Sequence, residues 1–514
     1  MRLRYLLPLL LALPLHAQGA PPGLDDFVAK VMKAYQVPGI ALTIVKDGKV
    51  VLARGYGVRE LGKPVPVDSQ TTFGIASNSK AFTATAINML VEEGKLQLDA
   101  PVVKYLPAFA LSDPYVTSQL TVRDLLVHRS GLGLGAGDLL WWPTSTYNRK
   151  EIAARLRYIP LATSFRSTYA YDNVLYLVAG EVIEAVSGMS WEDFIQRRIL
   201  SPLQMTDSRV RHSDASGPGN IAVTHAVVEG VLRPVAPFTS DNTNPAGGIN
   251  ASARDMAKWL LVQLDSGRTG AETRLWSTRT TRELWSIVTP IGSPQGLHPG
   301  GYALGFNVTD RFGQKMVTHT GGLPGYVSLV QMFPASRLGL AVLTNQESGA
   351  AFNWIASYIT NFYMNVPNPD YSAVDKVASA AAAPPRAERP MGPPRDSLSK
   401  PSLPLAKYAC VYTDPWYGDV SIRLEGGKLV LRMEHTPGMV GDLEHWQYDT
   451  FVARWRDREL RADAYVTFAL NPDGSVDQVK MRKFLESTDF SFDFQDLLLK
   501  RTPANRDCTG AATK

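Results

Sequence analysis

Ser77 and Lys80 stand three positions apart in the segment FGIASNSKAFTATAINMLVEEG, residues 73–94. Residues at this spacing lie on one face of a helix, so the two side chains would meet within one helical turn. A serine hydroxyl needs a neighbouring base, and a lysine whose pKa is lowered by burial can be that base. The free amide groups at the start of a helix would also stabilise an oxyanion. The pair therefore predicts a nucleophilic serine.

The residues after this pair are typical of a helix that would hold it in place. Apolar residues recur at helical spacing from Ala84 to Val91, and Gly94 stands where a C-terminal cap is expected. A second pair of the same spacing occurs at Ser397 and Lys400, but it lies among prolines without apolar periodicity. We interpret that second pair as part of a solvated linker.

Tyr171 and Asn173 form a second candidate pair, just before an apolar segment that we predict to be a helix. A tyrosine hydroxyl can relay protons, and an asparagine amide can hold both a lysine and a substrate carbonyl. A tyrosine that packs beside a helix cap would give the same pattern. The pattern therefore needs its context to be assigned a function.

His319, Thr320, Gly321 and Gly322 end a strand-like segment. Glycines there would let a substrate backbone approach and would leave N–H groups free to bind an oxyanion, although a strand end that simply turns at glycines would look the same. His128 is a further candidate, but we interpret a histidine beside a Ser-Gly turn as a structural hydrogen-bonding residue.

The loop Gly133–Tyr147 is rich in glycine and carries Trp141 and Trp142. Tryptophans in a loop can line a substrate cleft, or they can fold back and cover the underside of the loop. The sequence leaves both arrangements open.

Length and composition predict a folded protein of at least two domains. The chain has 514 residues, of which 45% are hydrophobic and 20% charged, with a net charge of +5. The positive charge is not collected in long basic runs, and no nucleic-acid-binding motif is present, so we expect no nucleic-acid partner. The eight histidines are scattered, and we expect neither a metal nor another cofactor.

The first twenty residues have the pattern of a secretory signal peptide, with Arg2 and Arg4 before the short apolar stretch Tyr5–Leu15. An uncleaved anchor is the alternative. No other stretch is long and apolar enough to span a membrane, so we expect a periplasmic or secreted protein. In such a compartment Cys410 and Cys508 can form a disulfide or remain free thiols.

The pattern of elements predicts an α+β domain whose antiparallel sheet collects both ends of the segment. A helix is expected at Leu24–Tyr35, strands at Gly39–Val45 and Val50–Tyr56, a short helix within Leu120–Leu132, helices at Asn173–Val186, Ser190–Ile199 and Ser252–Leu264, strands at Gly305–Val308, Val317–His319, Val327–Phe333 and Leu338–Thr344, and a helix at Phe352–Tyr363. Ser252 is the expected N-cap of its helix.

The residue composition and pattern of the chain change twice after this domain. Val374–Leu405 is rich in alanine and proline and is expected to be a partly extended linker. From Lys407 onward, apolar and polar residues alternate in short hairpins, as in a small antiparallel β-barrel. We therefore divide the chain into a signal peptide (1–20), a hydrolase domain (21–370), a linker (371–405) and a barrel domain (406–514).

Taken together and in this order, the motifs resemble those of the serine β-lactamase-like superfamily. This superfamily includes class C β-lactamases, D-alanyl-D-alanine carboxypeptidases, D-aminopeptidases and related esterases. The matching segments are FGIASNSKAFTA, TVRDLLVHRSGL, the block that begins YAYDN, PAGGINASARDMAKWL and HTGGLPGY. The resemblance covers about Leu24 to Tyr363 and implies a penicillin-binding-protein-like fold with a helical subdomain. The last domain looks like the lipocalin-like barrel appended to some members.

The resemblance implies a role for each candidate residue. Ser77 would be acylated, Lys80 and Tyr171 would share proton transfer, and Asn173 would orient the substrate amide. The backbone N–H groups of Ser77 and Gly322 would form the oxyanion hole. His319, Thr320 and Gly321 would contact the substrate beside them.

One departure from the family pattern affects the expected substrate. The β-lactamases usually carry Lys-Thr-Gly where this chain has His319-Thr320-Gly321, and a largely neutral histidine holds a carboxylate less strongly than a lysine does. We therefore expect an exported hydrolase of peptides, D-amino-acid amides or esters. The alternatives are a β-lactamase and a catalytically silent binding or sensor protein. Oligomer formation through the barrel is left open.

Overall fold

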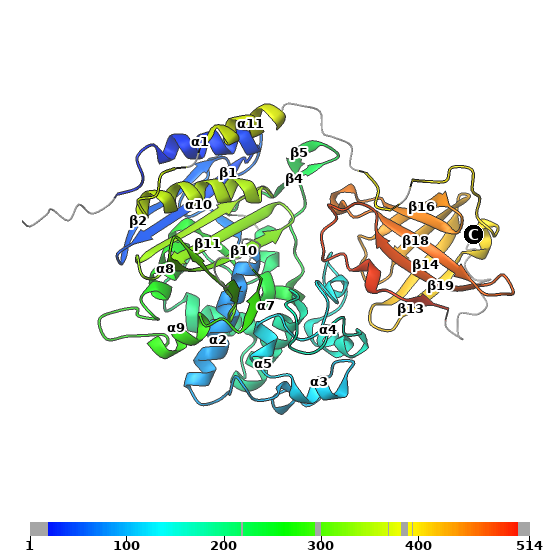
Figure 1. The fold of residues 1–514 in the computed structure, drawn as a ribbon, viewed down its shortest axis with the longest axis horizontal. Coiled ribbons are helices and arrows are strands. Elements are labelled where there is room, and N and C mark those ends of the chain that lie inside the picture. The colour runs from blue at the N-terminus through cyan, green and yellow to red at the C-terminus, as the bar shows by residue number, and fades with distance from the viewer. Residues whose placement is uncertain are drawn as a thin grey trace, which may run out of the picture.

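The protein consists of a larger α+β domain and a smaller barrel beside it (Figure 1). The structure is a computed structural model. It describes residues 19–216, 219–292, 300–368, 370–381, 389–392 and 394–501. The predicted signal peptide lies almost entirely outside the described residues.

An eight-stranded antiparallel sheet forms the centre of the larger domain, with the order β2-β1-β12-β11-β10-β9-β8-β7. The strands are β1 (Gly39–Lys46), β2 (Lys49–Gly57), β7 (Thr289–Ile291), β8 (Gly300–Tyr302), β9 (Asn307–Arg311), β10 (Gln314–Leu323), β11 (Tyr326–Phe333) and β12 (Leu338–Thr344). Strands from both ends of the domain meet where Ile40 pairs with Thr344. The prediction that the sheet collects both ends of the segment is confirmed.

Three helices, α1 (Leu24–Tyr35), α10 (Gly349–Tyr363) and α11 (Ser372–Ala381), lie on one face of the sheet (Figure 1). They share a core of buried apolar side chains with the strand residues Ile40, Leu42 and Leu340. The segment expected to be an extended linker thus begins as a helix. Val374 of α11 is fully buried, and Lys30 of α1 pairs with Asp375 at 2.9 Å.

The other face of the sheet is covered by α8 (Ala253–Leu264), while α2 (Ser79–Glu92) and α5 (Val174–Ser187) pack against each other in the same core. The side chain of Ser252 accepts a hydrogen bond from the backbone N–H of Asp255, which confirms the predicted N-cap of α8. The remaining helices and paired strands are α3 (Pro114–Gln119), α4 (Arg149–Arg155), α6 (Trp191–Ile195), α7 (Asn244–Gly247), α9 (Thr278–Leu284), β3 (Thr72–Gly74) with β6 (Asn250–Ser252), and β4 (His225–Val228) with β5 (Val231–Pro234).

Helix α2 is buried along nearly its whole length, since every residue from Ser79 to Leu90 is buried. Its side chains are packed on all sides, and Phe82 stacks on Trp259 of α8 with ring centroids 3.7 Å apart. The helix ends as expected, with Gly94 in the left-handed region at φ 70°. A helix enclosed in this way is a rigid support for the residues at its first turn.

The short helix expected within Leu120–Leu132 is absent, and only a 3-10 turn at Asp124–Leu126 forms there. Asp124 explains the difference. Its carboxylate accepts hydrogen bonds from the N–H and hydroxyl of Thr121 and forms ion pairs with Arg129 and Arg166. These local bonds give the backbone an alternative to helical pairing.

The C-terminal domain is a closed barrel of eight antiparallel strands. They are β13 (Cys410–Asp414), β14 (Gly418–Glu425), β15 (Lys428–Met433), β16 (Val440–Gln447), β17 (Thr450–Trp455), β18 (Ala464–Leu470), β19 (Val476–Lys483) and β20 (Leu499–Lys500). The predicted hairpins are confirmed as β14–β15 and β18–β19. Cys410 is buried and disulfide-bonded, while Cys508 lies outside the described residues.

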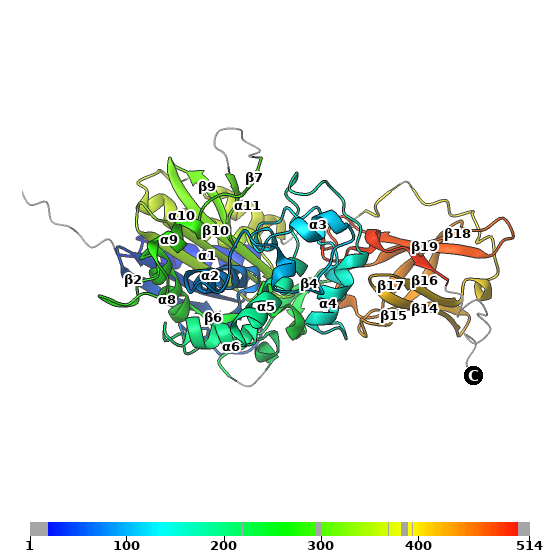
Figure 2. The ribbon, with the colours of Figure 1, turned by 90° about the horizontal axis from the view of Figure 1, so that it is seen from below.

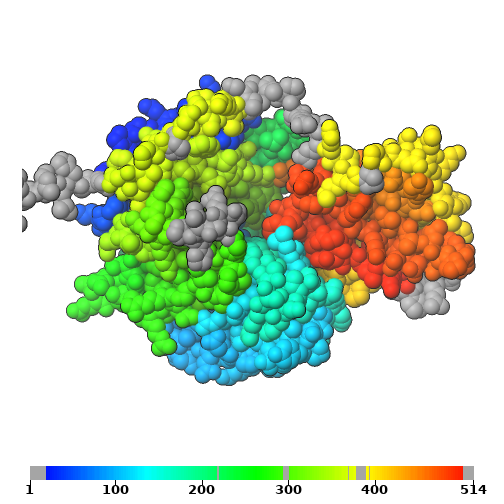
Figure 3. Space-filling model, in the orientation of Figure 1, coloured from blue at the N-terminus to red at the C-terminus, as the bar shows by residue number. Residues whose placement is uncertain are grey.

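The barrel is packed against the helical side of the larger domain. Figure 2 shows α4 next to the barrel, and Arg155 of that helix donates a hydrogen bond to the backbone oxygen of Trp416 at 3.0 Å. In Figure 3 the red atoms of the barrel domain, which belong to its last residues, lie directly against the cyan segment of the larger domain. One cluster of buried apolar side chains runs through both domains without a break.

Within the described residues, no single helix has the length and apolar character needed to cross a membrane; only α5 taken together with the bent segment that follows it meets that test.

Candidate active site

Ser77 lies in a tight turn between β3 and α2. Residues Ala76–Asn78 form a 3-10 turn that leads into the helix, and Ala76 has a positive φ of 49°. The turn is fastened to the sheet because Asn78 Nδ2 donates to Ser328 Oγ at 2.8 Å, and Ser328 donates to the backbone oxygen of Ile75 at 2.7 Å. The sheet and the buried helix therefore fix the serine from two sides.

Lys80 lies one turn into α2, and its side chain is fully buried. Its Nζ is 3.1 Å from Ser77 Oγ, 2.7 Å from Asn173 Oδ1 and 3.0 Å from the backbone oxygen of Ala246. The predicted meeting of Ser77 and Lys80 is confirmed. Burial lowers the pKa of Lys80 to about 7, although the carboxyls of Asp138 and Asp172 act to raise it. Close to neutral pH, a large share of this lysine is therefore an uncharged amine.

Tyr171 approaches the serine from a distant part of the chain. Its hydroxyl donates a hydrogen bond to Ser77 Oγ at 2.8 Å. The ring is held from behind by His128, whose ring centroid lies 4.3 Å from that of the tyrosine. Burial raises the pKa of Tyr171, so the phenol keeps its proton at neutral pH and is a donor there.

Asn173 connects Lys80 to a buried carboxyl group. Its Oδ1 accepts from Lys80, and its Nδ2 donates to Asp138 Oδ2 at 2.9 Å. The second oxygen of Asp138 accepts from Trp141 Nε1 at 2.8 Å. Burial raises the pKa of Asp138 to about 7, while the hydrogen bonds from Ser491, Asn173 and Trp141 oppose this shift.

The end of β10 runs beside the serine and brings His319, Thr320, Gly321 and Gly322 to the site. β9 pairs with β10 only as far as Thr318, so the following residues have no strand neighbour on that side. A Cβ on Gly321 would lie 2.2 Å from the backbone oxygen of Ile75, whereas a Cβ on Gly322 would meet nothing within 4 Å. Gly321 is therefore required for close approach, and Gly322 borders open space.

His319 is buried and uncharged. Its Nε2 lies 2.8 Å from the hydroxyl of Tyr302, and its Nδ1 lies 2.5 Å from the backbone oxygen of Thr320. The carbonyl can only accept, so Nδ1 carries the proton and Nε2 accepts from the tyrosine. Burial and the neighbouring Lys80 lower the pKa of His319 to about 3. The imidazole thus offers no positive charge to a substrate carboxylate.

His128 is fully buried, and its Nδ1 accepts a hydrogen bond from the backbone N–H of Asp172 at 3.2 Å. It contacts Tyr171 rather than Ser77, in agreement with its interpretation as a structural residue. The exposed pair at Ser397 and Lys400 lies far from this network in sequence and is solvated, as predicted.

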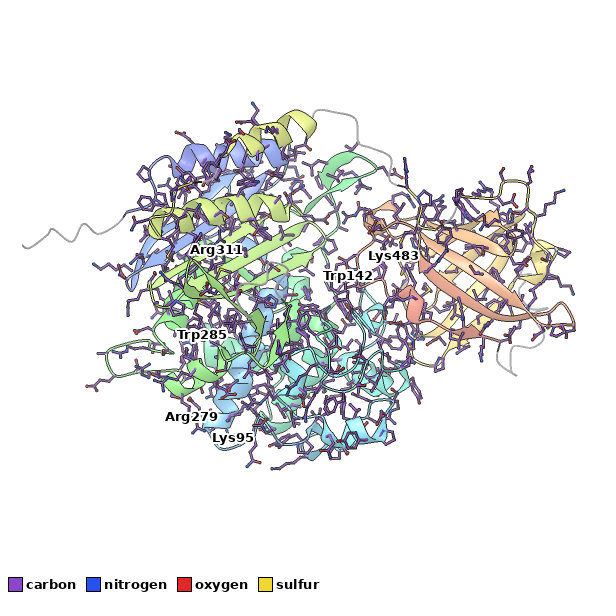
Figure 4. The ribbon with its side chains drawn as sticks, viewed as in Figure 1. Lys95, Trp142, Arg279, Trp285, Arg311 and Lys483 are labelled. Carbon is purple, nitrogen blue, oxygen red and sulfur yellow. The ribbon has the colours of Figure 1, made fainter. Side chains whose placement is uncertain are left out.

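A cavity of about 1190 Å³ opens above Ser77 and extends to the barrel. Trp142 lies at the junction of the two domains (Figure 4). Trp141 and Trp142 contact each other and Phe238, and all three line the cavity. Both arrangements considered for the tryptophans are therefore present, because they cover their own loop and also form a wall of the cleft.

Several residues of the site carry no sequence motif. Asp138, Tyr302, Ser491 and Asp493 all belong to the hydrogen-bond network, and Phe490 of the barrel domain lines the cavity. Asp138 lies in the loop Gly133–Tyr147, which was a candidate cleft wall because it carries two tryptophans. Ser491 contacts Asp138 from 353 positions away, and no local pattern predicts such a contact.

Among the described residues, no group of three or more histidine, cysteine, aspartate or glutamate side chains is arranged to hold a metal ion. The polar groups that meet around Ser77 and Lys80 are a hydroxyl, an amine, a phenol and an amide.

Comparison with known proteins agrees with this geometry. Residues 24–360 match the family model described as Beta-lactamase, and residues 394–501 match a domain of unknown function, DUF3471. The unguisins hydrolase ungD of Aspergillus violaceofuscus is 27% identical over 485 residues, which cover 87% of this chain and 85% of that protein.

Two solved structures show how far the fold is shared. The octameric penicillin-binding protein homologue from Pyrococcus abyssi has a TM-score of 0.59 and 25% identity, and the match covers 90% of this chain and 98% of that chain. The D-amino acid amidase from Ochrobactrum anthropi, complexed with L-phenylalanine, has a TM-score of 0.54 and 22% identity, covering 66% of this chain and 97% of that one. The first match extends over both domains.

Proposed function

The chain belongs to the beta-lactamase family, whose fold is that of serine hydrolases, and we propose that it is an exported enzyme that forms an acyl-enzyme at Ser77. The main support for the proposal is that the side-chain oxygen of Ser77 contacts two polar groups at once. Ser77 Oγ lies 3.1 Å from Lys80 Nζ and 2.8 Å from the Tyr171 hydroxyl. A serine placed between an amine and a phenol has both a proton acceptor and a proton donor within reach.

The protonation states suggest how the two groups divide the work. When Lys80 is neutral, its two N–H groups can remain on Asn173 and Ala246 while its lone pair accepts the proton of Ser77. Tyr171, which is protonated at neutral pH, donates to the serine oxygen and can pass its proton to the leaving group. Lys80 is then the base of acylation, and Tyr171 is the relay.

Deacylation would reverse these transfers with water in place of the leaving group. The relay of Lys80 and Tyr171 would take a proton from the water as it attacks the acyl carbonyl, and Ser77 would recover its proton as it leaves. In both steps the negative charge on the carbonyl oxygen would be held by the backbone N–H groups of Ser77 and Gly322. Such donors typically contribute about 2.7–4 kcal/mol to catalysis.

The cleft favours peptides, amides or esters of considerable size over small β-lactams. The uncharged His319 provides no cation for the carboxylate of an antibiotic. One wall of the cavity of about 1190 Å³ is formed by aromatic side chains, which are suited to apolar groups, and its barrel side also carries charged side chains such as Arg454 and Arg461. A relative named as an unguisins hydrolase supports hydrolysis as the activity.

Labelling with a fluorescent fluorophosphonate tests the assignment of Ser77. We expect the wild-type protein and Ser397→Ala, the control at the second serine–lysine pair, to be labelled equally. Ser77→Ala should lose at least 99% of the label, because the nucleophile is gone. Equal labelling of Ser77→Ala would remove Ser77 as the nucleophile.

A substrate panel then separates the possible activities. D- and L-amino-acid amides, short esters and a chromogenic cephalosporin should be assayed side by side, with turnover expected for amides or esters. Efficient turnover of the cephalosporin alone would indicate a β-lactamase. Ligand binding that survives Ser77→Ala without any turnover would indicate a binding protein on the same scaffold. N-terminal sequencing of protein recovered outside the cytoplasm would test export and cleavage near residue 20.

A further inference from the structure

A short segment of the C-terminal domain enters the active site of the larger domain. Residues 490–493 follow strand β19 and lie against the loop that carries Asp138. The ring of Phe490 meets that of Tyr171 edge-on, with centroids 6.0 Å apart and an interplanar angle of 90°. A Cβ on Gly135 would lie 2.8 Å from the Phe490 ring, so the loop and the segment fit together closely.

A continuous chain of hydrogen bonds leads from this segment to the proposed catalytic base. Ser491 Oγ donates to Asp138 Oδ2 at 2.8 Å, and the same oxygen accepts from Asn173 Nδ2 at 2.9 Å. The other end of the Asn173 amide accepts from Lys80 at 2.7 Å. The four side chains joined by these hydrogen bonds are all buried. The orientation of the Asn173 amide is therefore set by Asp138, and Ser491 fixes the oxygen of Asp138 that sets it.

Asp493 holds the backbone around Asp138. Its Oδ2 accepts from the N–H of Gly137 at 2.7 Å, and its Oδ1 accepts from the N–H of Leu139 at 3.0 Å. The backbone on both sides of Asp138 is thus hydrogen-bonded to one residue of the other domain. The two carboxyl groups are buried close to each other, and their repulsion disfavours a negative charge on both.

We propose that Ser491 and Asp493 of the C-terminal domain are positioning residues for Asp138: Ser491 stabilises its negative charge beside Lys80, and Asp493 holds the loop that carries it. As far as turnover is concerned, this inference rests on the proposed function. The hydroxyl of Ser491 stabilises the ionised form of Asp138. The charge on Asp138 in turn favours the protonated form of Lys80.

Other groups also act on Lys80 and must stay constant in a test. Those that face it are the carboxyl of Asp172, the phenols of Tyr171 and Tyr176, and the imidazoles of His128, His212 and His319. The pKa values of all three histidines are lowered by burial, so the imidazoles remain uncharged at neutral pH. Asp496 is the further charged group beside Asp493.

The two positioning residues should respond differently to substitution. Ser491→Ala removes the donor that stabilises ionised Asp138. Asp138 then holds its proton to higher pH, and the midpoint of the Lys80 titration should fall by about half a pH unit or more. Asp493→Asn removes the competing charge but keeps one acceptor for the loop. Asp138 should then remain charged, and the Lys80 midpoint should stay in place or rise.

Thr146→Ala is the matched control for a lost contact between the domains. The hydroxyl of Thr146 lies 3.0 Å from His435 Nδ1 of the barrel domain, so it also bridges the domains from the loop 133–147. It is not part of the series of hydrogen bonds that leads from Ser491 to Lys80. This variant should leave the Lys80 titration and the rate of turnover as they are in the wild-type protein.

The test measures the titration of Lys80 directly, in the full chain labelled with ¹³Cε-lysine, where the Lys80 resonance is identified by its loss in Lys80→Gln. A fall of the midpoint in Ser491→Ala, but not in Asp493→Asn or Thr146→Ala, supports the proposal. The proposal is overturned if Ser491→Ala titrates as the wild-type protein does, or if all three variants shift together, as general loosening of the interface would cause.

Turnover by the same variants separates this inference from the proposed function. If neither the wild-type protein nor any variant is labelled by a fluorophosphonate, the proposed function is wrong. The NMR titration still decides the role of Ser491 in that case. If the wild-type protein is active, the acidic limb of its labelling rate should move to lower pH in Ser491→Ala together with the Lys80 midpoint. A limb that stays in place would contradict the coupling.

Discussion

At Lys80, burial and the charge of neighbouring carboxyls shift the pKa in opposite directions. Loss of water lowers the pKa, and the two buried carboxyls Asp138 and Asp172 raise it, with a pKa of about 7 as the result. The pKa values of both carboxyls are themselves raised to about 7 by burial. The three groups are therefore expected to titrate together rather than as independent sites.

The rate of acylation should rise with pH through about 7, because the base is needed without its proton. Two units below that midpoint, at about pH 5, the rate should be about 100-fold lower than on the plateau. Lys80→Arg should abolish the reaction at every pH, since a guanidinium does not deprotonate in a protein. The measurement is the rate of fluorophosphonate labelling between pH 5 and 9. A rate that does not depend on pH would contradict the assignment of Lys80.

Contacts within one turn of helix were predictable at this scale, and contacts between distant residues were not. Ser77 and Lys80 meet because three positions separate them, which is a property of any helix. Asp138 and Ser491 meet only because two domains pack together, and their types fit many surface positions equally well. The neutral state of His319 was predicted in part from its residue type, but its partner Tyr302 was not.

At the scale of elements, the structure confirms those helices and strands for which apolar periodicity and end signals predict the same bounds. Helix α1 has the predicted bounds, Leu24–Tyr35, and α8 begins directly after the predicted cap at Ser252. Leu120–Leu132 has apolar residues but forms only a 3-10 turn, since Asp124 binds Thr121 and Arg129 within the segment and Arg166 outside it. Strand β10 runs beyond its predicted end at His319 to Leu323, because its pairing with β11 continues across the glycines.

Gly321 and Gly322 offer a matched pair of substitutions on this strand. A Cβ at Gly321 would collide with the backbone of Ile75 and with Ser328 Oγ at 2.6 Å, so Gly321→Ala should push β10 away from the turn of Ser77. We expect a loss of about 1–3 kcal/mol in the free energy of unfolding and a loss of fluorophosphonate labelling. Gly322→Ala, with open space around the new methyl group, should unfold at nearly the wild-type temperature. Equal destabilisation by both would show that the close approach is not the cause.

At the scale of the whole molecule, the two domains share a core and a set of polar contacts. Tyr147 illustrates the contact, since its hydroxyl donates to the backbone oxygen of Tyr417 at 2.5 Å and its ring stacks on His435 with centroids 4.2 Å apart. Ion pairs at the rim, such as Arg461 with Glu347, add little stability in solvent. The apolar contacts are therefore expected to hold the domains together.

We expect the described domains to unfold in one calorimetric transition, because the apolar core is continuous across their boundary. Tyr147→Ala should weaken the interface by about 3 kcal/mol, as for other large buried rings, and should separate the unfolding of the barrel from that of the larger domain. Differential scanning calorimetry of both proteins checks this. Two separate transitions in the wild-type protein would mean that the interface does not couple the domains.

The pairing of β1 with β12 sets an order of events while the chain is being made. Ile40 finds its partner Thr344 only 304 positions later, so the ribosome must release almost the whole larger domain before its sheet can close. Until then the nascent polypeptide has no complete core to bury. For a protein that is exported, as we propose, such a long delay would leave time for a translocation channel to take up the chain while it is still unfolded.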